Sequence, residues 1–155
     1  MIDDARSQLV DNIRIAIADK RTETEVLAAA AELIDSFSDG YNWTGFYLKR
    51  GNAFEVGPYI GEETPHKKID FNQGICGSAA SQKKTVVVDD VNLDPRYLAC
   101  SLSTRSEIVV PLMNGERCLG EIDIDSSRPA FFNRQDQQML EAIADTIVKR
   151  LTEIS

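Results

Sequence analysis

The sequence predicts an α+β fold with a central antiparallel sheet and helices near the two ends of the chain. Apolar residues recur at helical spacing near both ends, and apolar and polar residues alternate along the middle of the chain. The chain has 155 residues, of which 43% are apolar and 27% are charged. This length and balance are typical of one globular domain that buries a core without disulfides. We expect the helices to pack on one face of the sheet, which leaves the other face free to line a pocket.

Three long helices are expected, over about residues 3–19, over about 23–39, and after Asn133 as an N-cap. Thr22 and Glu25 have the spacing of a capping box, which places the start of the second helix. Each helix has an apolar stripe at helical spacing. The stripes are formed by Ala5, Leu9, Ile13 and Ile17, by Val26, Ala29, Ala30, Leu33 and Phe37, and by Met139, Leu140, Ile143, Ala144, Ile147 and Leu151.

The middle of the chain predicts short strands and one short helix. In the strand expected over residues 42–49, Trp43 and Tyr47 fall on one face, and Phe46 and Leu48 fall on the other. Further extended segments are expected at 53–59, 66–71 and 85–88, with a helix of small residues at 75–81.

A hairpin is expected from residues 107–113 and 117–125, joined around Asn114-Gly115. A two-residue turn at Asn114-Gly115 would mix the apolar and polar faces of the two strands. A three-residue loop or one bulge aligns the apolar faces instead. That register places Glu107 on the same face as Asp123.

The charge balance narrows the range of partners. The chain has 17 basic and 25 acidic residues, a formal net charge of −8. Nucleic acid and anionic lipid require a basic surface, so neither is expected as a partner, whereas a cation or an amine suits this chain better. No apolar run is long enough for a membrane span, and the first residues lack the pattern of a signal peptide. We expect a cytoplasmic protein with reduced cysteines.

Four carboxylates fall on one face of the expected hairpin. They are Glu107, Glu121, Asp123 and Asp125. Buried charges are costly without a partner, so this face is either solvated or lines a pocket that holds a cation, a metal ion or an ammonium group. Trp43 or Tyr47 on the same face would add an aromatic wall.

Three cysteines have different surroundings in the sequence. Cys100 lies in a polar loop near two arginines, which lower a thiol pKa, although it could equally be an incidental loop residue. Cys76 opens the short helix, where backbone N–H groups favour a thiolate, or is simply a small buried residue. Cys118 is expected in the apolar core beside Ile122. With one histidine, His66, and no Cys-x-x-Cys pair, no zinc site and no cofactor are expected.

Five motifs in sequence order resemble the GAF domain of the free methionine-(R)-sulfoxide reductase type. They are Asn-Trp-Thr-Gly-Phe-Tyr at 42–47, Gly-Ile-Cys-Gly at 74–77, Ala-Cys at 99–100, Ser-Glu-Ile-Val-Val-Pro at 106–111 and Asp-Ile-Asp-Ser at 123–126. The resemblance spans about residues 43–140. It implies a single GAF domain over residues 1–155, with a ligand pocket on the sheet face opposite the terminal helices.

The resemblance also implies roles for individual residues. Cys100 would be the thiol that attacks the sulfoxide sulfur and becomes a sulfenic acid, and Cys76 would be able to form a disulfide with it. Glu107, Asp123 and Asp125 would bind the ammonium group of the free amino acid, and Trp43 and Tyr47 would wall the pocket. It further implies thioredoxin as the reductant and a homodimer.

The sequence departs from the reductase pattern in three places, one of them the segment Asp94-Pro95-Arg96-Tyr97-Leu98 before Cys100. His66 stands where that family has a third cysteine, ten residues before Cys76. Ser101 follows Cys100, where the family usually has Asp. Two functions therefore stay open: a reductase of free methionine-(R)-sulfoxide, and a GAF sensor that binds an amino-acid-like or other small ligand without turnover.

Overall fold

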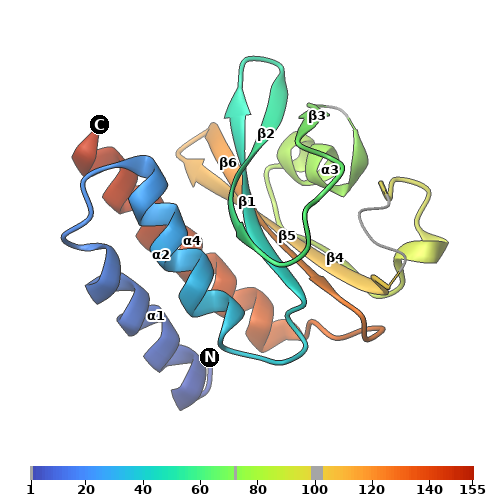
Figure 1. The fold of residues 1–155 in the computed structure, drawn as a ribbon, viewed down its shortest axis with the longest axis horizontal. Coiled ribbons are helices and arrows are strands. Elements are labelled where there is room, and N and C mark those ends of the chain that lie inside the picture. Colours follow the sequence, from blue (N-terminus) through green and yellow to red (C-terminus); the bar gives the residue numbers. More distant parts are fainter. Residues whose placement is uncertain (1, 72, 99–102) are drawn as a thin grey trace.

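The computed structural model describes residues 2–71, 73–98 and 103–155, and it confirms the α+β class (Figure 1). The helices are α1 (Asp4–Ile17), α2 (Glu23–Asp35), α3 (Gly74–Gln82) and α4 (Arg134–Ile154), with a short 3₁₀ helix η1 (Val91–Leu93). The strands are β1 (Trp43–Arg50), β2 (Ala53–Ile60), β3 (Lys68–Asp70), β4 (Val86–Val88), β5 (Ser106–Asn114) and β6 (Arg117–Ser126). None of the helices in the described part of the chain is long and apolar enough to cross a membrane.

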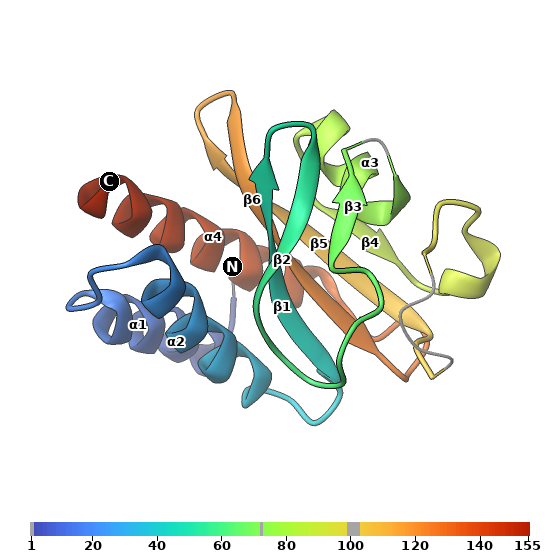
Figure 2. The same cartoon turned by 45° about the horizontal axis from the view of Figure 1, so that its top comes forward.

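The strands form one antiparallel sheet in the order β3-β2-β1-β6-β5-β4. Figures 1 and 2 show α1, α2 and α4 gathered on one side of the sheet and α3 on the other. The long helices pack on a large apolar core that includes Phe46, Ile122 and Ile124. A second core under α3 includes Trp43 and Tyr47. The two faces of β1 thus contribute to different cores, as its alternation predicts, and α3 packs on the face that was expected to be free.

The helices α2 and α4, whose sequences predict N-caps, both begin with complete capping boxes. The Thr22 hydroxyl accepts a hydrogen bond from the Glu25 N–H, and the Glu25 carboxylate accepts one from the Thr22 N–H. Asn133 and Asp136 make the same reciprocal pair at the start of α4. These side chains satisfy backbone donors that a helix leaves unpaired in its first turn.

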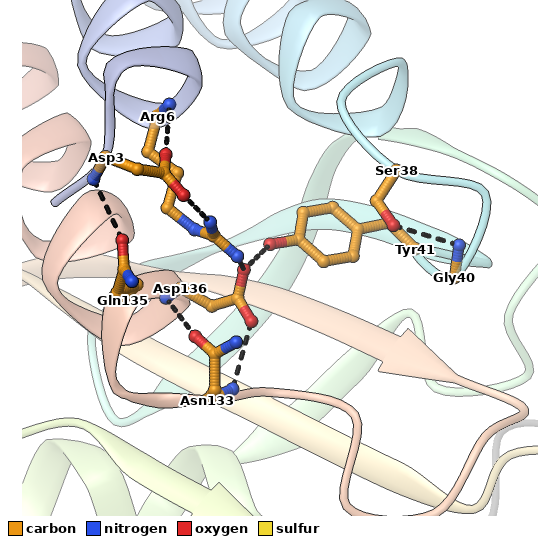
Figure 3. Close-up of polar contacts among 8 residues, drawn as sticks. All are labelled: Asp3, Arg6, Ser38, Gly40, Tyr41, Asn133, Gln135 and Asp136. Carbon is orange, nitrogen blue, oxygen red and sulfur yellow. Dashed lines mark hydrogen bonds and ion pairs between the residues drawn. The ribbon is translucent and has the colours of Figure 1, made fainter.

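Asp136 also joins three separate parts of the helical layer (Figure 3). Its Oδ1 accepts hydrogen bonds from the Arg6 guanidinium of α1 and from the Tyr41 hydroxyl before β1, both at 2.9 Å. Its Oδ2 accepts one from the Asn133 N–H, and the side chain is buried. A buried carboxylate with several charge-assisted and neutral donors is well compensated. This network ties α1 and the segment before β1 to the start of α4.

The β5–β6 hairpin contains a bulge, one of the two arrangements that the sequence allows for aligning the apolar faces. Asn114 pairs with Arg117 and Met113 with Cys118, but Leu112 pairs with Gly120, so Leu119 is the extra residue. The turn therefore lies at Gly115-Glu116, one residue later than expected. Beyond the bulge the apolar faces align. Glu107 lies opposite Asp125, and so on the same sheet face as Asp123, as predicted.

The expected place of Cys118 in the helix-side core is wrong. The bulge lies between Cys118 and Gly120, and one extra residue moves the side chains before it to the opposite sheet face. Cys118 is half-buried beside the second core, and its thiol donates to the Gly120 carbonyl at 3.3 Å.

Candidate functional site

The four carboxylates lie together on the sheet face under α3, and we call them the carboxylate cluster. Glu107 comes from β5, and Glu121, Asp123 and Asp125 come from alternate positions of β6. Their exposed fractions are 5%, 0%, 3% and 3% in that order. The alternative of a solvated face is therefore wrong, and the cluster belongs to the protein interior.

The geometry of the cluster brings its oxygens close to one another. One carboxylate oxygen from each of Glu107, Asp123 and Asp125 lies within 4.8 Å of the other two. Among the described residues, Oδ1 of Asp123, Oδ1 of Asp125 and both oxygens of Glu121 are buried with no hydrogen-bond partner. Such atoms have lost water without a replacement, so the cluster is built for a ligand that brings positive charge or donors.

Burial sets the protonation of the cluster. It raises the pKa of Glu121 and of Asp125 well above their ordinary values, and repulsion by Asp123 adds to both shifts. Burial also raises the pKa of Asp123, while its hydrogen bond with Glu107 acts in the opposite direction. The cluster therefore holds protons at pH values where exposed carboxylates have lost them.

Aromatic rings form one wall beside the cluster. Trp43 pairs with Asp125 across β1 and β6, and its ring stacks on Tyr47 and on Tyr59 at centroid distances of 6.1 and 5.2 Å. The Trp43 indole N–H donates to the Glu62 carbonyl at 3.0 Å. The structure places Trp43 and Tyr47 as the sequence predicts and adds Tyr59, which nothing in the sequence singled out.

His66 lies at the edge of this aromatic wall. The Tyr47 hydroxyl donates to its backbone carbonyl at 2.8 Å, and its own N–H donates to the Thr64 hydroxyl at 3.1 Å. Its side chain is half-buried. His66, which stands where the reductase family has a third cysteine, therefore lies in the loop that accepts the Tyr47 hydrogen bond.

Two cavities open on the cluster. The larger, of about 350 Å³, is lined by Asn42, Trp43, Glu62, Thr64, Ser103, Thr104, Asp125 and Ser127. The smaller, of about 20 Å³, is lined by Tyr47, Ile69, Gly74, Ile75, Cys76, Leu98, Glu107 and Asp123. The larger volume lies at the lower end of the ~300–1,000 Å³ usual for small-molecule sites. Polar residues, an aromatic ring and a carboxylate line it, which suits a small zwitterion.

Cys76 lies directly over the cluster, in the first turn of α3. Gly74 has a φ of 68°, a left-handed conformation that favours glycine and lets the helix begin there. The Cys76 side chain is 4% exposed, and its thiol donates to Oδ2 of Asp123 at 3.7 Å. Burial raises the Cys76 pKa well above its ordinary value, and Asp123 and Glu121 raise it further. This direction is opposite to the one expected from a helix N-terminus, because local desolvation and negative charge outweigh the helix dipole.

Cys100, predicted as the catalytic thiol, lies outside the described residues. The described chain stops at Leu98 and resumes at Ser103, and these two residues line the smaller and the larger cavity respectively. The two arginines near Cys100 in sequence have acidic partners: Arg96 pairs with Asp94 at 2.6 Å and Arg105 with Asp90 at 3.6 Å.

Glu121 is the cluster residue that sequence reasoning left without a role in ligand binding. Its alternation with Asp123 and Asp125 placed it on the right face. Its full burial depends on α3, which covers this part of β6, and that packing cannot be read from a strand pattern.

Comparison with known proteins identifies the family. The family model described as GAF domain matches residues 22–151. The chain belongs to the GAF domain family. Among its GAF relatives, a free methionine-R-sulfoxide reductase of Saccharomyces cerevisiae is 41% identical over 112 residues, which are 70% of this chain and 62% of that protein. The chain thus spans less than two thirds of the yeast relative's length.

Two further relatives cover more of their own length. A free methionine-R-sulfoxide reductase of Escherichia coli is 32% identical over 133 residues, which are 83% of this chain and 79% of that protein. The X-ray structure of free methionine-R-sulfoxide reductase from Neisseria meningitidis in complex with its substrate is 34% identical, with a TM-score of 0.92. That match covers 99% of this chain and 93% of the other, so this GAF domain closely follows the fold of a reductase.

Proposed function

We propose that this GAF protein reduces free methionine-(R)-sulfoxide to methionine. The observation that carries the proposal is the buried carboxylate cluster beside an aromatic-walled cavity, in a chain that is 34% identical to a substrate-bound reductase with a TM-score of 0.92. The GAF sensor alternative has less support, because the named reductases extend over most of this chain.

The cluster explains a preference for a free amino acid. The ammonium group of the ligand supplies donors to Glu107, Asp123 and Asp125, whose nearest oxygens lie within 4.8 Å of one another. Hydrogen bonds to charged groups contribute about 1.5–3 kcal/mol each. A peptide-bound methionine has an uncharged amide at this position, so it would gain much less from the cluster.

Cys100 is the proposed nucleophile. The net step converts a thiol and a sulfoxide into a sulfenic acid and a thioether: the oxygen moves to the Cys100 sulfur, and two electrons move to the methionine sulfur. A second thiol then condenses with the sulfenic acid, which gives a disulfide and water. An external dithiol such as thioredoxin reduces that disulfide by thiol–disulfide exchange.

Cys76 is the proposed second thiol, and its surroundings constrain it. It contacts Asp123 and its pKa is raised, so little of it is a thiolate at neutral pH. Resolution by Cys76 is then slow unless the ligand's positive charge or protons neutralise the cluster. We further propose a homodimer, the state that the family resemblance implies, and a cytoplasmic location, which suits its reduced cysteines.

The test is methionine release from the separate R and S epimers of free methionine sulfoxide, with dithiothreitol or with thioredoxin as reductant. The proposal expects release from the R epimer alone, and no release by the Cys100→Ser variant. Cys76→Ser should slow only the thioredoxin-supported reaction and leave one stoichiometric round of reduction intact.

The same assay distinguishes the sensor. Binding of methionine sulfoxide without release of methionine, with both reductants, would contradict the reductase. The His66→Cys variant sharpens the result, because it restores the third cysteine that the family resemblance implies. It should raise thioredoxin-supported turnover, and Cys100→Ser should abolish that gain.

A further inference from the structure

A groove between α3 and the chain that leads toward Cys100 has no part in the proposed binding of the ligand. It has a volume of about 450 Å³ and is lined by one face of α3 and by Pro95, Arg96, Tyr97 and Leu98. The described residues that line this groove and those that line the cavity of about 350 Å³ beside the carboxylate cluster are different sets. The groove therefore stays open when a small ligand occupies that cavity.

We propose that this groove is the docking surface for a dithiol reductant protein of the thioredoxin class. The inference rests on the proposed function, in which Cys76 and Cys100 form a disulfide. Cys76 lies in α3, and Cys100 follows Leu98 by two positions in the sequence. Such a disulfide joins the two elements that form the walls of the groove, so a protein docked there is placed to reduce it.

The groove adjoins the small cavity that contains the Cys76 side chain. Gly74 and Leu98 line both cavities. A Cβ at Gly74 would lie 3.0 Å from Cδ1 of Leu98 and 3.1 Å from its Cγ, so the Leu98 side chain packs on the Gly74 backbone. Cys76 is 4% exposed. The contact of Leu98 with Gly74 thus lies between the groove and the buried thiol.

Hydrogen bonds hold the two walls of the groove in a fixed relation. The Arg96 guanidinium donates to the Ser78 hydroxyl of α3 at 2.6 Å. It also donates to both carboxylate oxygens of Asp94, at 2.9 and 2.6 Å. A bidentate pair of this kind orients the guanidinium, so the groove is formed before a partner binds. A preformed surface loses less conformational entropy on binding than one that must be ordered.

The side chains around the groove suit a protein better than a single small thiol. Ser81 and Gln82 of α3 offer hydroxyl and amide groups, and Pro95 and Tyr97 offer apolar surface. Two positions before Pro95, Leu93 of η1 is 82% exposed. Protein interfaces combine apolar contacts at their centre with polar groups at their rim, and this surface presents both.

The reduction is a thiol–disulfide exchange between the two proteins. A thiolate of the reductant attacks one sulfur of the Cys76–Cys100 disulfide, which forms a mixed disulfide and releases the other cysteine as a thiolate. The second thiol of the reductant's Cys-x-x-Cys pair then attacks the mixed disulfide. The reductant leaves as a disulfide, and two electrons and two protons have moved to Cys76 and Cys100.

The experiment measures the reduction of the disulfide in the absence of methionine sulfoxide. Diamide, an oxidant of thiols, converts the full chain to the Cys76–Cys100 disulfide, which mass spectrometry of peptides identifies. Thioredoxin or dithiothreitol then reduces this form, and the two second-order rate constants are compared. Dithiothreitol needs no docking surface, so it controls for the accessibility of the disulfide itself.

Two variants test the groove, and one serves as a control. Ser81→Trp places a large ring in the groove from an exposed position of α3. It should lower the rate constant for thioredoxin ~10-fold or more and leave that for dithiothreitol within ~2-fold, since it blocks only a partner that docks there. Leu93→Ala should lower the rate constant for thioredoxin ~3-fold or more. Ser7→Trp makes the same change at an exposed position of α1, on the other side of the sheet, and should react as the parent does.

An unchanged rate constant for thioredoxin in both Ser81→Trp and Leu93→Ala would overturn the proposal. An equal loss with both reductants, or the failure of diamide to join Cys76 to Cys100, would also overturn it. A loss confined to glutathione, used as a third reductant, would assign the groove to a small thiol instead of a protein. A chain that shows the expected rates but releases no methionine from methionine sulfoxide would contradict the proposed function alone.

Discussion

Glu121 shows how burial changes one carboxylate of this protein. It is 0% exposed, burial raises its pKa well above the ordinary value, and repulsion by Asp123 adds to the shift. A carboxylate whose pKa is higher in the folded state binds more protons there than in the unfolded state. The free energy of unfolding therefore falls as pH rises from about 4.3, the unfolded pKa, toward the raised folded value. The ligand-free protein should be less stable at pH 7 than at pH 5.

Glu121→Gln should raise the free energy of unfolding at pH 7. The amide keeps the shape of the side chain but never ionises, so it gains ~1.4 kcal/mol for each pH unit by which the Glu121 pKa is raised, up to pH 7. Urea unfolding at pH 5 and pH 7 measures both the gain and the flatter pH dependence. Glu55→Gln, at an exposed position of β2, is the matched control. A less stable Glu121→Gln protein at pH 7 would show that Glu121 is compensated in the ligand-free state.

At the level of elements, the position of one extra residue decides which side chains reach the site. The alternation of the hairpin strands predicted a three-residue loop or a bulge, because a two-residue turn alone would not align the apolar faces of β5 and β6. The alternation could not place it at Leu119, since a bulge before or after Cys118 gives the same register at Glu107. That ambiguity is why the face of Cys118 was predicted wrongly while the face of Asp123 was predicted correctly.

Gly120, next to the bulge, lies where β1 and β6 approach closely. A Cβ there would lie 2.5 Å from the Tyr47 carbonyl oxygen and 3.1 Å from the Leu48 Cα, both backbone atoms. Gly120→Ala should therefore force the strands apart and lower the free energy of unfolding by about 1–3 kcal/mol. Chemical denaturation measures the loss, and an unchanged midpoint would contradict the close approach.

The contact of Tyr41 with Asp136 tests the network of the helical layer. Tyr41→Phe removes only the hydroxyl, because the ring still packs 5.6 Å from Phe132. Loss of a hydrogen bond to a buried charged group should lower the free energy of unfolding by about 1.5–3 kcal/mol. Binding of methionine sulfoxide should be unchanged, because Asp136 lies on the helix side of the sheet. A loss of ligand binding with unchanged stability would contradict this assignment.

At the level of the whole molecule, one sheet face carries the apolar core that stabilises the fold, and the other face carries the candidate site. The capping boxes and apolar stripes allowed the long helices and the sheet face under them to be predicted from the sequence. In the structure α1, α2 and α4 cover that face (Figure 2). The sequence also predicted that the carboxylates share the other face with Trp43 and Tyr47. Their burial, the stacking of Tyr59 and the raised pKa of Cys76 depend on α3 and on the loop that holds His66, which pack from other parts of the chain.

The direct test of the ammonium site compares kcat/KM for free methionine-(R)-sulfoxide with that for its N-acetyl derivative, in the parent protein and in Asp123→Asn. Acetylation removes the positive charge and leaves the sulfoxide intact. The parent should lose about 10- to 150-fold on acetylation, the equivalent of ~1.5–3 kcal/mol, and Asp123→Asn should show a much smaller difference. Equal kcat/KM for both substrates in the parent protein would contradict the account.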